Sequence, residues 1–253
     1  TDAVVLGNAS GALANVSLNE QSRGEMAQAG VASSLSDLCM RYAESDDDQE
    51  RRVLSNTCSV LQTISKHELG RQVLVASGAL ASVLGVLKHQ KQVGLVQSIT
   101  GLLANSAVDD RAVTVLVDAK GVEVLVSVVD HCSEPKVLRQ VSECLANCAR
   151  CNAANPSGLS QMVAQHSVPQ LVAICIQTAD YRIAEHCLFA LSCITHECAA
   201  AVVSATVSRF ENAQQVVSNL QQHCFRSTGL QPSKASNPRN LQQYASHILV
   251  DWS

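Results

Sequence analysis

Cysteine and histidine are the residue types in this sequence that come nearest to forming a chemical site. Cys148 and Cys151 have the Cys-x-x-Cys spacing of a zinc knuckle, and Cys144 lies one helical turn earlier. Further thiol and imidazole groups follow at Cys187, Cys193 and His196. As thiolates and neutral imidazoles these groups could bind zinc, and an exposed Cys151 thiol could act as a nucleophile.

Other catalytic patterns are incomplete. The pairs His67-Glu68 and His196-Glu197 are not followed by the second histidine of a zinc-protease helix. The sequence has no phosphate-binding glycine loop and no Gly-x-Ser-x-Gly motif. We therefore expect a protein that is not an enzyme and that has no catalytic residues and no cofactor.

Composition narrows the classes of partner. The chain has 253 residues, a formal net charge of -4 and only 3% aromatic residues, which is a poor surface for nucleic-acid phosphates and bases. Its apolar runs are far shorter than the ~20 residues of a membrane-spanning helix, and no secretory signal opens it. The 11 cysteines do not form a disulfide pattern. We expect a cytoplasmic or nuclear protein without nucleic-acid binding or membrane insertion.

Internal repetition is the main signal. Five segments share one short motif with a central leucine. They are Gly11-Ala-Leu-Ala-Asn15, Ser59-Val-Leu-Gln-Thr63, Gly101-Leu-Leu-Ala-Asn105, Glu143-Cys-Leu-Ala-Asn147 and Phe189-Ala-Leu-Ser-Cys193. The leucines, at 13, 61, 103, 145 and 191, are separated by 48, 42, 42 and 46 residues.

A second landmark follows each of the first four leucines. It is Ala-Gly-Val at 29–31, Ser-Gly-Ala at 77–79, Lys-Gly-Val at 120–122 and His-Ser-Val at 166–168. The pattern therefore predicts that each unit consists of a long helix that ends at the leucine motif, a shorter helix, a turn made by glycine and a third helix. Val113 to Val129 could alternatively form a β-hairpin, but the equivalent stretches Gln72 to Leu87 and Gln161 to Cys175 have helical spacing.

Polar insertions explain the unequal gaps. We expect an acidic loop at Glu44 to Glu50 and a second loop at Asn152 to Ser157, where Pro156 prevents simple continuation of a helix. A polar loop at 224–237 precedes an apolar-faced closing helix that ends near Trp252. The predicted domains are a repeat region at 1–204 and a divergent closing repeat at 205–253.

The repeat register bears on the cysteines. Cys144 aligns with Ala12, Val60, Leu102 and Ala190, and Cys148 aligns with Val16, Ile64, Ser106 and Ile194. Because most of these positions are apolar, we expect both thiols to be packed in the core, with no metal bound. Cys151 aligns with polar residues and is the better candidate for a reactive thiol.

A leucine-asparagine motif, a helix, and a glycine turn with Leu-Val spacing every ~42 residues resemble the armadillo repeat. The resemblance covers residues 1 to about 204. It implies an all-α, right-handed α-α superhelix, an armadillo-like solenoid of about four three-helix units with a divergent last one. It also implies that the third helix of each unit lines a concave groove. HEAT repeats, with two helices per unit, are the neighbouring alternative.

The resemblance implies a role for the last position of the leucine motif. In karyopherin-alpha proteins an asparagine ladder here clamps an extended peptide, and Asn15, Asn105 and Asn147 match it, whereas Thr63 and Cys193 depart from it. The alternative is that each asparagine ties its own helix to the adjoining loop. Those proteins also place a tryptophan four residues earlier, where this chain has none, so binding of basic nuclear-import signals is not expected.

Register also indicates a mildly basic stripe on the third helices. Nine residues before each leucine stand Arg52, Gly94, Lys136 and Arg182, and six before stand Ser55, Gln97, Arg139 and Glu185. Such a stripe favours an acidic or phosphorylated partner. The predicted partner-binding residues are Asn15, Thr63, Asn105, Lys136, Arg139, Glu143, Asn147 and Arg182.

We therefore expect a non-catalytic scaffold or adaptor that binds an extended or helical protein segment in its groove. Two alternatives stay open, namely a permanent structural subunit of a larger assembly and the helical part of a multidomain enzyme or co-chaperone. The sequence also begins inside a third helix. A repeat buries its apolar face only against neighbours, so we expect a fragment, or another chain that covers Ala3, Val4 and Val5.

Overall fold

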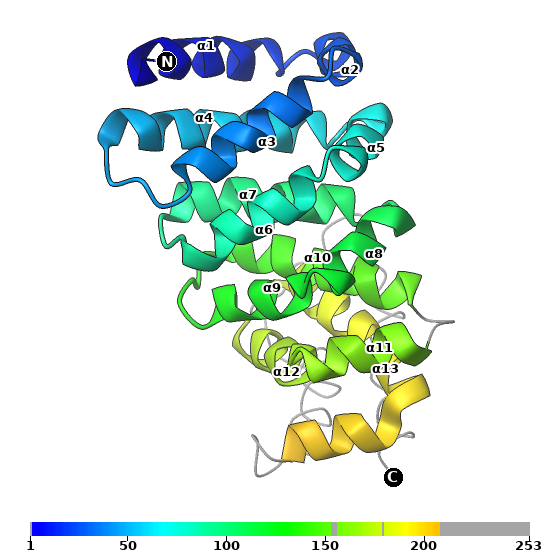
Figure 1. Ribbon diagram of the computed structural model, residues 1–253. Helices are drawn as coiled ribbons and strands as arrows, with labels where there is room; N and C mark the ends of the chain where they lie inside the picture. Colours follow the sequence, from blue (N-terminus) through cyan, green and yellow to red (C-terminus); the bar gives the residue numbers. More distant parts are fainter. Residues whose placement is uncertain (1, 153–155, 179, 208–253) are drawn as a thin grey trace. The chain divides into compact units, whose positions relative to one another are not determined.

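The computed structural model describes residues 2–152, 156–178 and 180–207, and the regular structure of these residues is entirely α-helical (Figure 1). The first helices are α1 (Ala3–Val16), α2 (Glu20–Gln28), α3 (Val31–Tyr42), α4 (Asp48–Ile64), α5 (Glu68–Ala76), α6 (Ala79–His89) and α7 (Val93–Ser106). They are followed by α8 (Asp110–Asp118), α9 (Gly121–Val129), α10 (Pro135–Cys151), α11 (Pro156–Ala164), α12 (Ser167–Gln177) and α13 (Tyr181–Val207).

The chain divides into two compact units, and the division falls in the sequence of α10. The first unit, residues 1–140, contains α1 to α9 and the beginning of α10. The second unit starts at residue 141 and contains the rest of α10 with α11, α12 and α13. We describe each unit separately.

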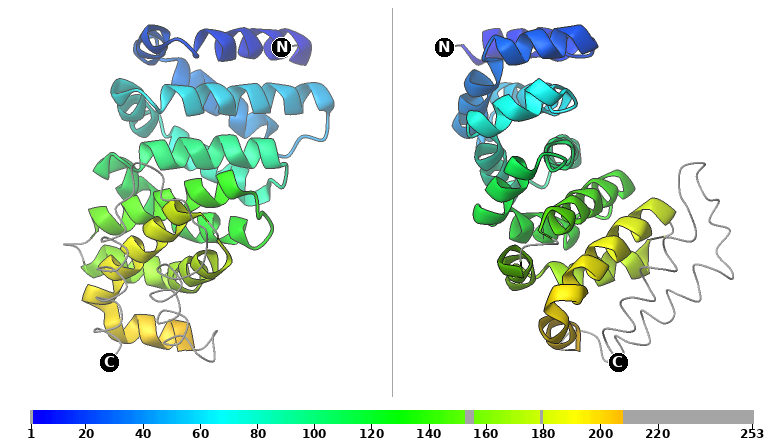
Figure 2. Two further views of the ribbon diagram at one scale, coloured as in Figure 1. Left: turned by 180° about the vertical axis from the view of Figure 1, so that it is seen from behind. Right: turned by 90° about the vertical axis from the view of Figure 1, so that its right-hand side faces the viewer.

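Helices of the first unit stack in the order that the leucine motifs predict. The helices that end at the leucine motif, α1, α4 and α7, are the third helices when a unit is counted from the short helix after that motif. They pack one on the next and lie as nearly parallel layers when viewed from behind (Figure 2). The second helices α3, α6 and α9 form a parallel series, and so do the first helices α2, α5 and α8. The prediction of stacked three-helix repeats is confirmed.

The leucine motif anchors each layer. Leu61 in α4 and Leu103 in α7 are fully buried, and burial of one such side chain contributes about 1.5–3 kcal/mol. Leu54 and Leu102 surround them, also fully buried. The core thus lies between successive layers and continues from one repeat to the next.

Acidic and amide side chains start several helices. Asp47 accepts hydrogen bonds from the backbone N–H groups of Gln49 and Glu50 at 2.9 and 3.0 Å, so α4 begins at Asp48. The predicted acidic loop Glu44 to Glu50 is therefore too long, because its second half forms the first turn of α4. Carboxylates are favourable there, since the N-terminus of a helix carries a partial positive charge.

The turns before α3, α6, α9 and α12 differ from the glycine prediction at two repeats, where Lys120 and His166 have the left-handed φ. Gly30 and Gly78 adopt left-handed φ angles of 70° and 73°, as expected for a glycine stop. In the next repeat Lys120 takes that conformation, with φ 56°, and Gly121 is the first residue of α9. Gly121 is needed for a different reason, because a Cβ there would lie 2.7 Å from the carbonyl oxygen of Leu116.

The stretch that could have been a β-hairpin is helical. Val113 to Val129 forms most of α8 and all of α9. Valines at helical spacing are buried on one side of these helices, namely Val113, Val117, Val122 and Val126. The rejection of the hairpin is confirmed.

In the second unit, α11 and α12 both pack on α13. This last helix continues without a break to Val207, whereas the equivalent helix α4 ends three residues after its leucine, at Ile64. The predicted loop at 224–237, the closing helix and Trp252 lie outside the described residues. Among the described residues, no single helix is long and apolar enough to cross a membrane, although the bent pair α5–α6 meets that test jointly.

Candidate functional site

The third helices of the first unit present a continuous set of polar side chains. We call this set the third-helix face. It consists of Arg52, Ser55, Ser59, Gln62, Gln97, Asn105, Lys136 and Arg139. These side chains are exposed or half-buried, while Val53, Leu54 and Val60 on the other sides of α4 are buried. The face exists because polar residues recur at the same register of α4, α7 and the start of α10.

Two residues at the last position of the leucine motif tie neighbouring layers together. The Thr63 hydroxyl donates to Ser17 Oγ at 2.6 Å, at the end of α1. In the next layer Asn105 Nδ2 donates to Ser65 Oγ at 3.0 Å and approaches the carbonyl oxygen of Gln62 at 3.5 Å. Thr63 is buried and Asn105 is half-buried. The main role of this position is therefore to hold neighbouring layers together.

The remaining amide oxygen of Asn105 can still accept a hydrogen bond from a ligand, because only its nitrogen is used. Asn15 differs from Asn105, since it is exposed and its amide has no hydrogen-bond partner in the described part of the chain. Asn147 and Cys193 occupy the same position in the second unit, where both are half-buried.

Glutamines add a feature that the sequence reasoning missed. Gly101 lies at the centre of α7, and a Cβ there would collide with Gln62 Nε2 and lie 2.7 Å from Gln140 Nε2. Carboxamides from the layers on both sides therefore converge over this glycine. Thr100 fixes one of them by donating to Gln140 Oε1 at 2.8 Å. The signal was the absence of a side chain at Gly101, which leaves room for both amides.

Cationic groups lie toward the start of the third helices. Arg52 donates to Asn8 Oδ1 at 3.0 Å, and Lys136 and Arg139 are exposed on the first turns of α10. The predicted residues Glu143 and Arg182 belong to the second unit, where each is half-buried. From the predicted set, Thr63 and Asn105 thus lie near the ends of α4 and α7, and Lys136 and Arg139 lie near the start of α10.

The cysteines pack as core thiols. Cys144 and Cys148 are fully buried. A hydrogen bond with Cys148 and burial raise the pKa of Cys144 well above its usual value, so this group is a neutral thiol in the core. Cys151 is half-buried. Among the described residues, no group of three His, Cys, Asp or Glu side chains has the geometry of a metal site.

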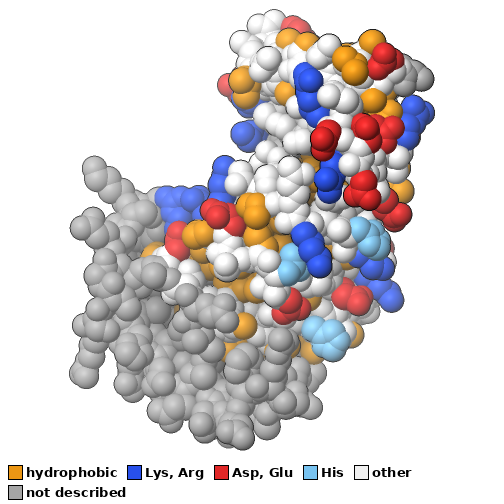
Figure 3. Space-filling model, turned by 90° about the vertical axis from the view of Figure 1, so that its left-hand side faces the viewer, with side chains coloured by type: hydrophobic (Ala, Val, Ile, Leu, Met, Phe, Trp, Pro, Cys, Tyr) orange, Lys and Arg blue, Asp and Glu red, His pale blue; other side chains and the backbone are white. Residues whose placement is uncertain are grey.

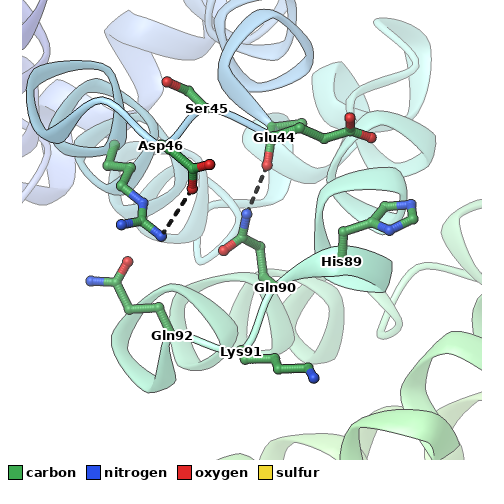
Figure 4. A pocket seen from close by; sticks show the side chains of 9 residues that line it. Glu44, Ser45, Asp46, His89, Gln90, Lys91 and Gln92 are labelled. Carbon is green, nitrogen blue, oxygen red and sulfur yellow. Dashed lines mark hydrogen bonds and ion pairs between the residues drawn. The ribbon is translucent and has the colours of Figure 1, made fainter.

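A shallow cavity of about 460 Å³ lies between the loop before α4 and the loop before α7. Gln90 Nε2 connects the loops by donating to the carbonyl oxygen of Ala43 at 2.7 Å (Figure 4). The lining of the cavity combines the acids Glu44 and Asp46 with Lys91 and other polar side chains. Acidic and basic groups are likewise interspersed on this side of the molecule (Figure 3), so the cavity does not select one sign of charge.

Comparison with known proteins supports the fold. No family model and no curated protein sequence matches the chain. A solved designed armadillo repeat protein has a TM-score of 0.71 and 17% identity, covering 98% of this chain and 93% of that one. A computationally designed armadillo repeat protein for modular peptide recognition has a TM-score of 0.74 and 18% identity, covering 97% and 92%.

A third structure, a designed armadillo repeat protein in complex with the peptide (KR)4, has a TM-score of 0.68 and 17% identity, covering 98% of this chain and 91% of that one. At such low identities the likeness concerns the fold alone. Together with the leucine register and the stacked three-helix units, it shows that the chain folds as an armadillo-like repeat solenoid.

Proposed function

We propose that this protein is a non-catalytic scaffold that binds an extended protein segment along the third-helix face of its first unit. The observation that carries the proposal is the convergence of Gln62 and Gln140 over Gly101, beside the half-buried Asn105. These uncharged amides both donate and accept hydrogen bonds, as a peptide backbone does, so they suit binding that is tolerant of the partner's side chains.

The spacing of the layers suits an extended chain. Packed helices lie about 8–10 Å apart, and an extended peptide advances about 3.3–3.6 Å per residue. A bound segment that crosses α4, α7 and α10 would therefore meet a new layer at about every third residue. Each contact is small, but contacts repeated in register add to a useful affinity.

Charge favours an acidic or phosphorylated segment. Arg52, Lys136 and Arg139 form the charged part of the third-helix face, and that face contains no carboxylate. Guanidinium and ammonium groups form charge-assisted hydrogen bonds with carboxylates and phosphates. The designed relative that was solved with (KR)4 holds a cationic peptide, whereas the third-helix face described here favours the opposite charge.

Peptide binding to the full chain tests the proposal. We expect a fluorescent (Asp-Ser)5 peptide to bind more tightly than (Lys-Arg)4 in a fluorescence anisotropy titration. The pair Arg52→Glu and Lys136→Glu should weaken binding of the acidic peptide by about tenfold or more, because two attractive charges become repulsive. The pair Gln62→Ala and Gln140→Ala should weaken it less, by about threefold to tenfold.

A matched control reverses the same number of positive charges at positions outside the third-helix face. Arg41 and Lys88 are exposed in the last turns of the second helices α3 and α6, which are not part of the third-helix face. Arg41→Glu with Lys88→Glu should affect binding only through net charge. Equal losses in both charge-reversal pairs, or tighter binding of (Lys-Arg)4, would refute the proposed surface.

A reducing location, cytoplasmic or nuclear, is part of the proposal. Burial raises the pKa of Cys187, and a hydrogen bond with Cys39 together with burial raises the pKa of Cys58. Such buried thiols are typical of proteins from reducing compartments.

A further inference from the structure

Two glutamine side chains meet over Gly101, and both place their nitrogen atoms there. A Cβ on Gly101 would collide with Gln62 Nε2 and would lie 2.7 Å from Gln140 Nε2. Gln62 belongs to α4 and Gln140 to α10, so two layers contribute to one point on α7. We call these two amide groups the glutamine pair. Because both nitrogens lie within 2.7 Å of the same point, a single small group of a ligand can reach both.

The glutamine pair offers hydrogen-bond donors at this point. Thr100 donates to Gln140 Oε1 at 2.8 Å, which leaves the nitrogen of Gln140 toward Gly101. Among the described residues, neither Nε2 group has a hydrogen-bond partner, and both side chains are half-buried. An amide nitrogen does not accept hydrogen bonds, so the two groups cannot satisfy each other. The glutamine pair therefore calls for an acceptor from outside the fold.

A comparable amide one layer earlier is used differently. Asn56 Nδ2 lies 3.3 Å from the position that a Cβ on Gly11 would take. This nitrogen donates to the carbonyl oxygen of Gly7 at 3.0 Å and to Ser10 Oγ at 3.3 Å. Both N–H groups of Asn56 thus serve the fold, whereas the described residues leave those of the glutamine pair for a ligand.

The charge beside the glutamine pair favours an anionic acceptor. Lys136 lies four residues before Gln140 on α10, and residues four apart share one side of a helix. The Lys136 side chain is exposed. A carboxylate brings two acceptor oxygens for two donors, and its charge is opposite to that of Lys136. A lysine or arginine side chain would bring only further donors.

We propose that the glutamine pair binds the side-chain carboxylate of one aspartate or glutamate in the bound segment. Each Nε2 group donates to one carboxylate oxygen, and Lys136 adds a longer-range attraction. This inference rests on the proposed function and narrows it. The third-helix face then tolerates most side chains of its partner but recognises one acidic residue opposite Gly101, and that residue fixes the register of the segment on the layers.

An isosteric substitution tests the donor role. Gln140→Glu keeps the shape of the side chain but replaces the donating nitrogen by a negatively charged oxygen. In a fluorescence anisotropy titration with (Asp-Ser)5, acetylated and amidated at its ends, we expect this variant to bind about tenfold more weakly or worse. Gln97→Glu makes the same change on the third-helix face outside the glutamine pair, and it should weaken binding by less than about threefold.

A variant without a change in charge tests the same point. Gly101→Ala should displace both amides, because its Cβ would occupy their position. Binding of (Asp-Ser)5 should weaken by about fivefold, while the Tm should fall by less than about 2 °C, since alanine is the better helix former. Gly94→Ala is the matched control on the same helix. A Cβ there would meet nothing within 4 Å, so binding should stay within about twofold.

Peptide variants test which group of the partner is bound. Five versions of (Asp-Ser)5 each carry asparagine in place of one aspartate. On the original chain one version should bind about fivefold more weakly than the other four, because a single aspartate meets the glutamine pair. On Gln140→Glu that same version should bind no worse than (Asp-Ser)5, since its carboxamide can donate to the introduced carboxylate.

The results distinguish this inference from the proposed function. No binding of (Asp-Ser)5 by the original chain overturns both. If reversal of Arg52 and Lys136 weakens binding but Gln140→Glu and Gln97→Glu have equal effects, the third-helix face stands and the glutamine pair is refuted as a carboxylate site. If Gln140→Glu weakens all five peptide versions by the same factor as (Asp-Ser)5, the glutamine pair holds a main-chain carbonyl group, and the inference is likewise overturned.

Discussion

Two helices of the first unit carry almost the same motif in different surroundings. Gly11-Ala-Leu-Ala-Asn15 lies in α1, and Gly101-Leu-Leu-Ala-Asn105 lies in α7. In α7 both leucines are fully buried, and the asparagine donates to Ser65 of the preceding layer. In α1 the equivalent Ala12 and Asn15 are exposed.

The difference shows that sequence register alone does not determine what a residue does. Leu103 is buried because α4 packs on one side of α7 and the start of α10 follows on the other. Among the described helices, α1 packs closely only on α4. Contacts between layers, and not the motif by itself, convert the same residue types into a core leucine or a structural amide.

The largest expected effect contrasts the two motif leucines. Leu103→Ala should reduce the free energy of unfolding by about 2–5 kcal/mol, because it leaves a cavity in a fully buried site. Leu13→Ala should cost about half as much or less, since Leu13 is only half-buried. Urea denaturation followed by circular dichroism measures both, and equal losses would show that the layers do not differ in packing.

The two motif asparagines give the next contrast. Asn105→Ala should destabilise the protein by about 1 kcal/mol, because Ser65 loses its amide partner in a half-buried site. Asn15→Ala should change the free energy of unfolding by less than about 0.5 kcal/mol, since Asn15 is exposed. A loss for Asn15→Ala that matches the loss for Asn105→Ala would contradict the assigned role.

The residues that cap the N-termini of helices extend the comparison to the pH dependence of stability. Asn19 caps α2 by accepting from the Ser22 N–H at 3.2 Å, and Asp109 caps α8 from the same register. The side-chain hydrogen bond from Arg111 lowers the pKa of Asp109, so its contribution is present above the ordinary aspartate pKa near 4 and is lost as pH falls through the lowered value.

Replacement of Asp109 by asparagine should therefore flatten the acid dependence. Between pH 6 and pH 3 the original chain should lose up to about 1 kcal/mol more stability than Asp109→Asn, because the amide does not titrate. Chemical denaturation at the two pH values measures this difference. Identical losses in the two proteins would show that the Asp109–Arg111 contact does not contribute.

The smallest expected effect lies at the loop tips. Leu18 and Val108 follow α1 and α7 at the same register and are 67% and 55% exposed. Leu18→Lys and Val108→Lys should each change stability by less than about 0.5 kcal/mol. A larger effect at Val108 alone would mean that a further part of the chain covers that tip.

The order of the helices could be predicted from the sequence because the leucine positions recur with a fixed second landmark. The same leucines correctly predicted that Cys144 and Cys148 are buried. Errors arose where a local interaction competed with the pattern. Lys120 takes the left-handed turn although Gly121 follows it, because Gly121 is required for close packing on Leu116.

The candidate site was less predictable. The motif asparagines lie on the helices that carry the third-helix face, but Asn105 serves the neighbouring layer through Ser65. Gln62 and Gln140 were overlooked because they are 78 residues apart, and only the stacking of their helices brings both side chains to Gly101. Such convergence depends on how the helices pack in three dimensions, and the sequence pattern of a single helix does not reveal that packing.

A double-mutant cycle between Asn105 and Ser65 tests the stacking of α7 on α4 most directly. The two single variants Asn105→Ala and Ser65→Ala and the double variant are compared by urea denaturation, with Asn105 and Ser17 as a control pair. The stacked arrangement predicts a coupling free energy of about 0.5–1 kcal/mol for Asn105 and Ser65, and about zero for the control pair. Zero coupling between Asn105 and Ser65 would contradict the layered fold described here.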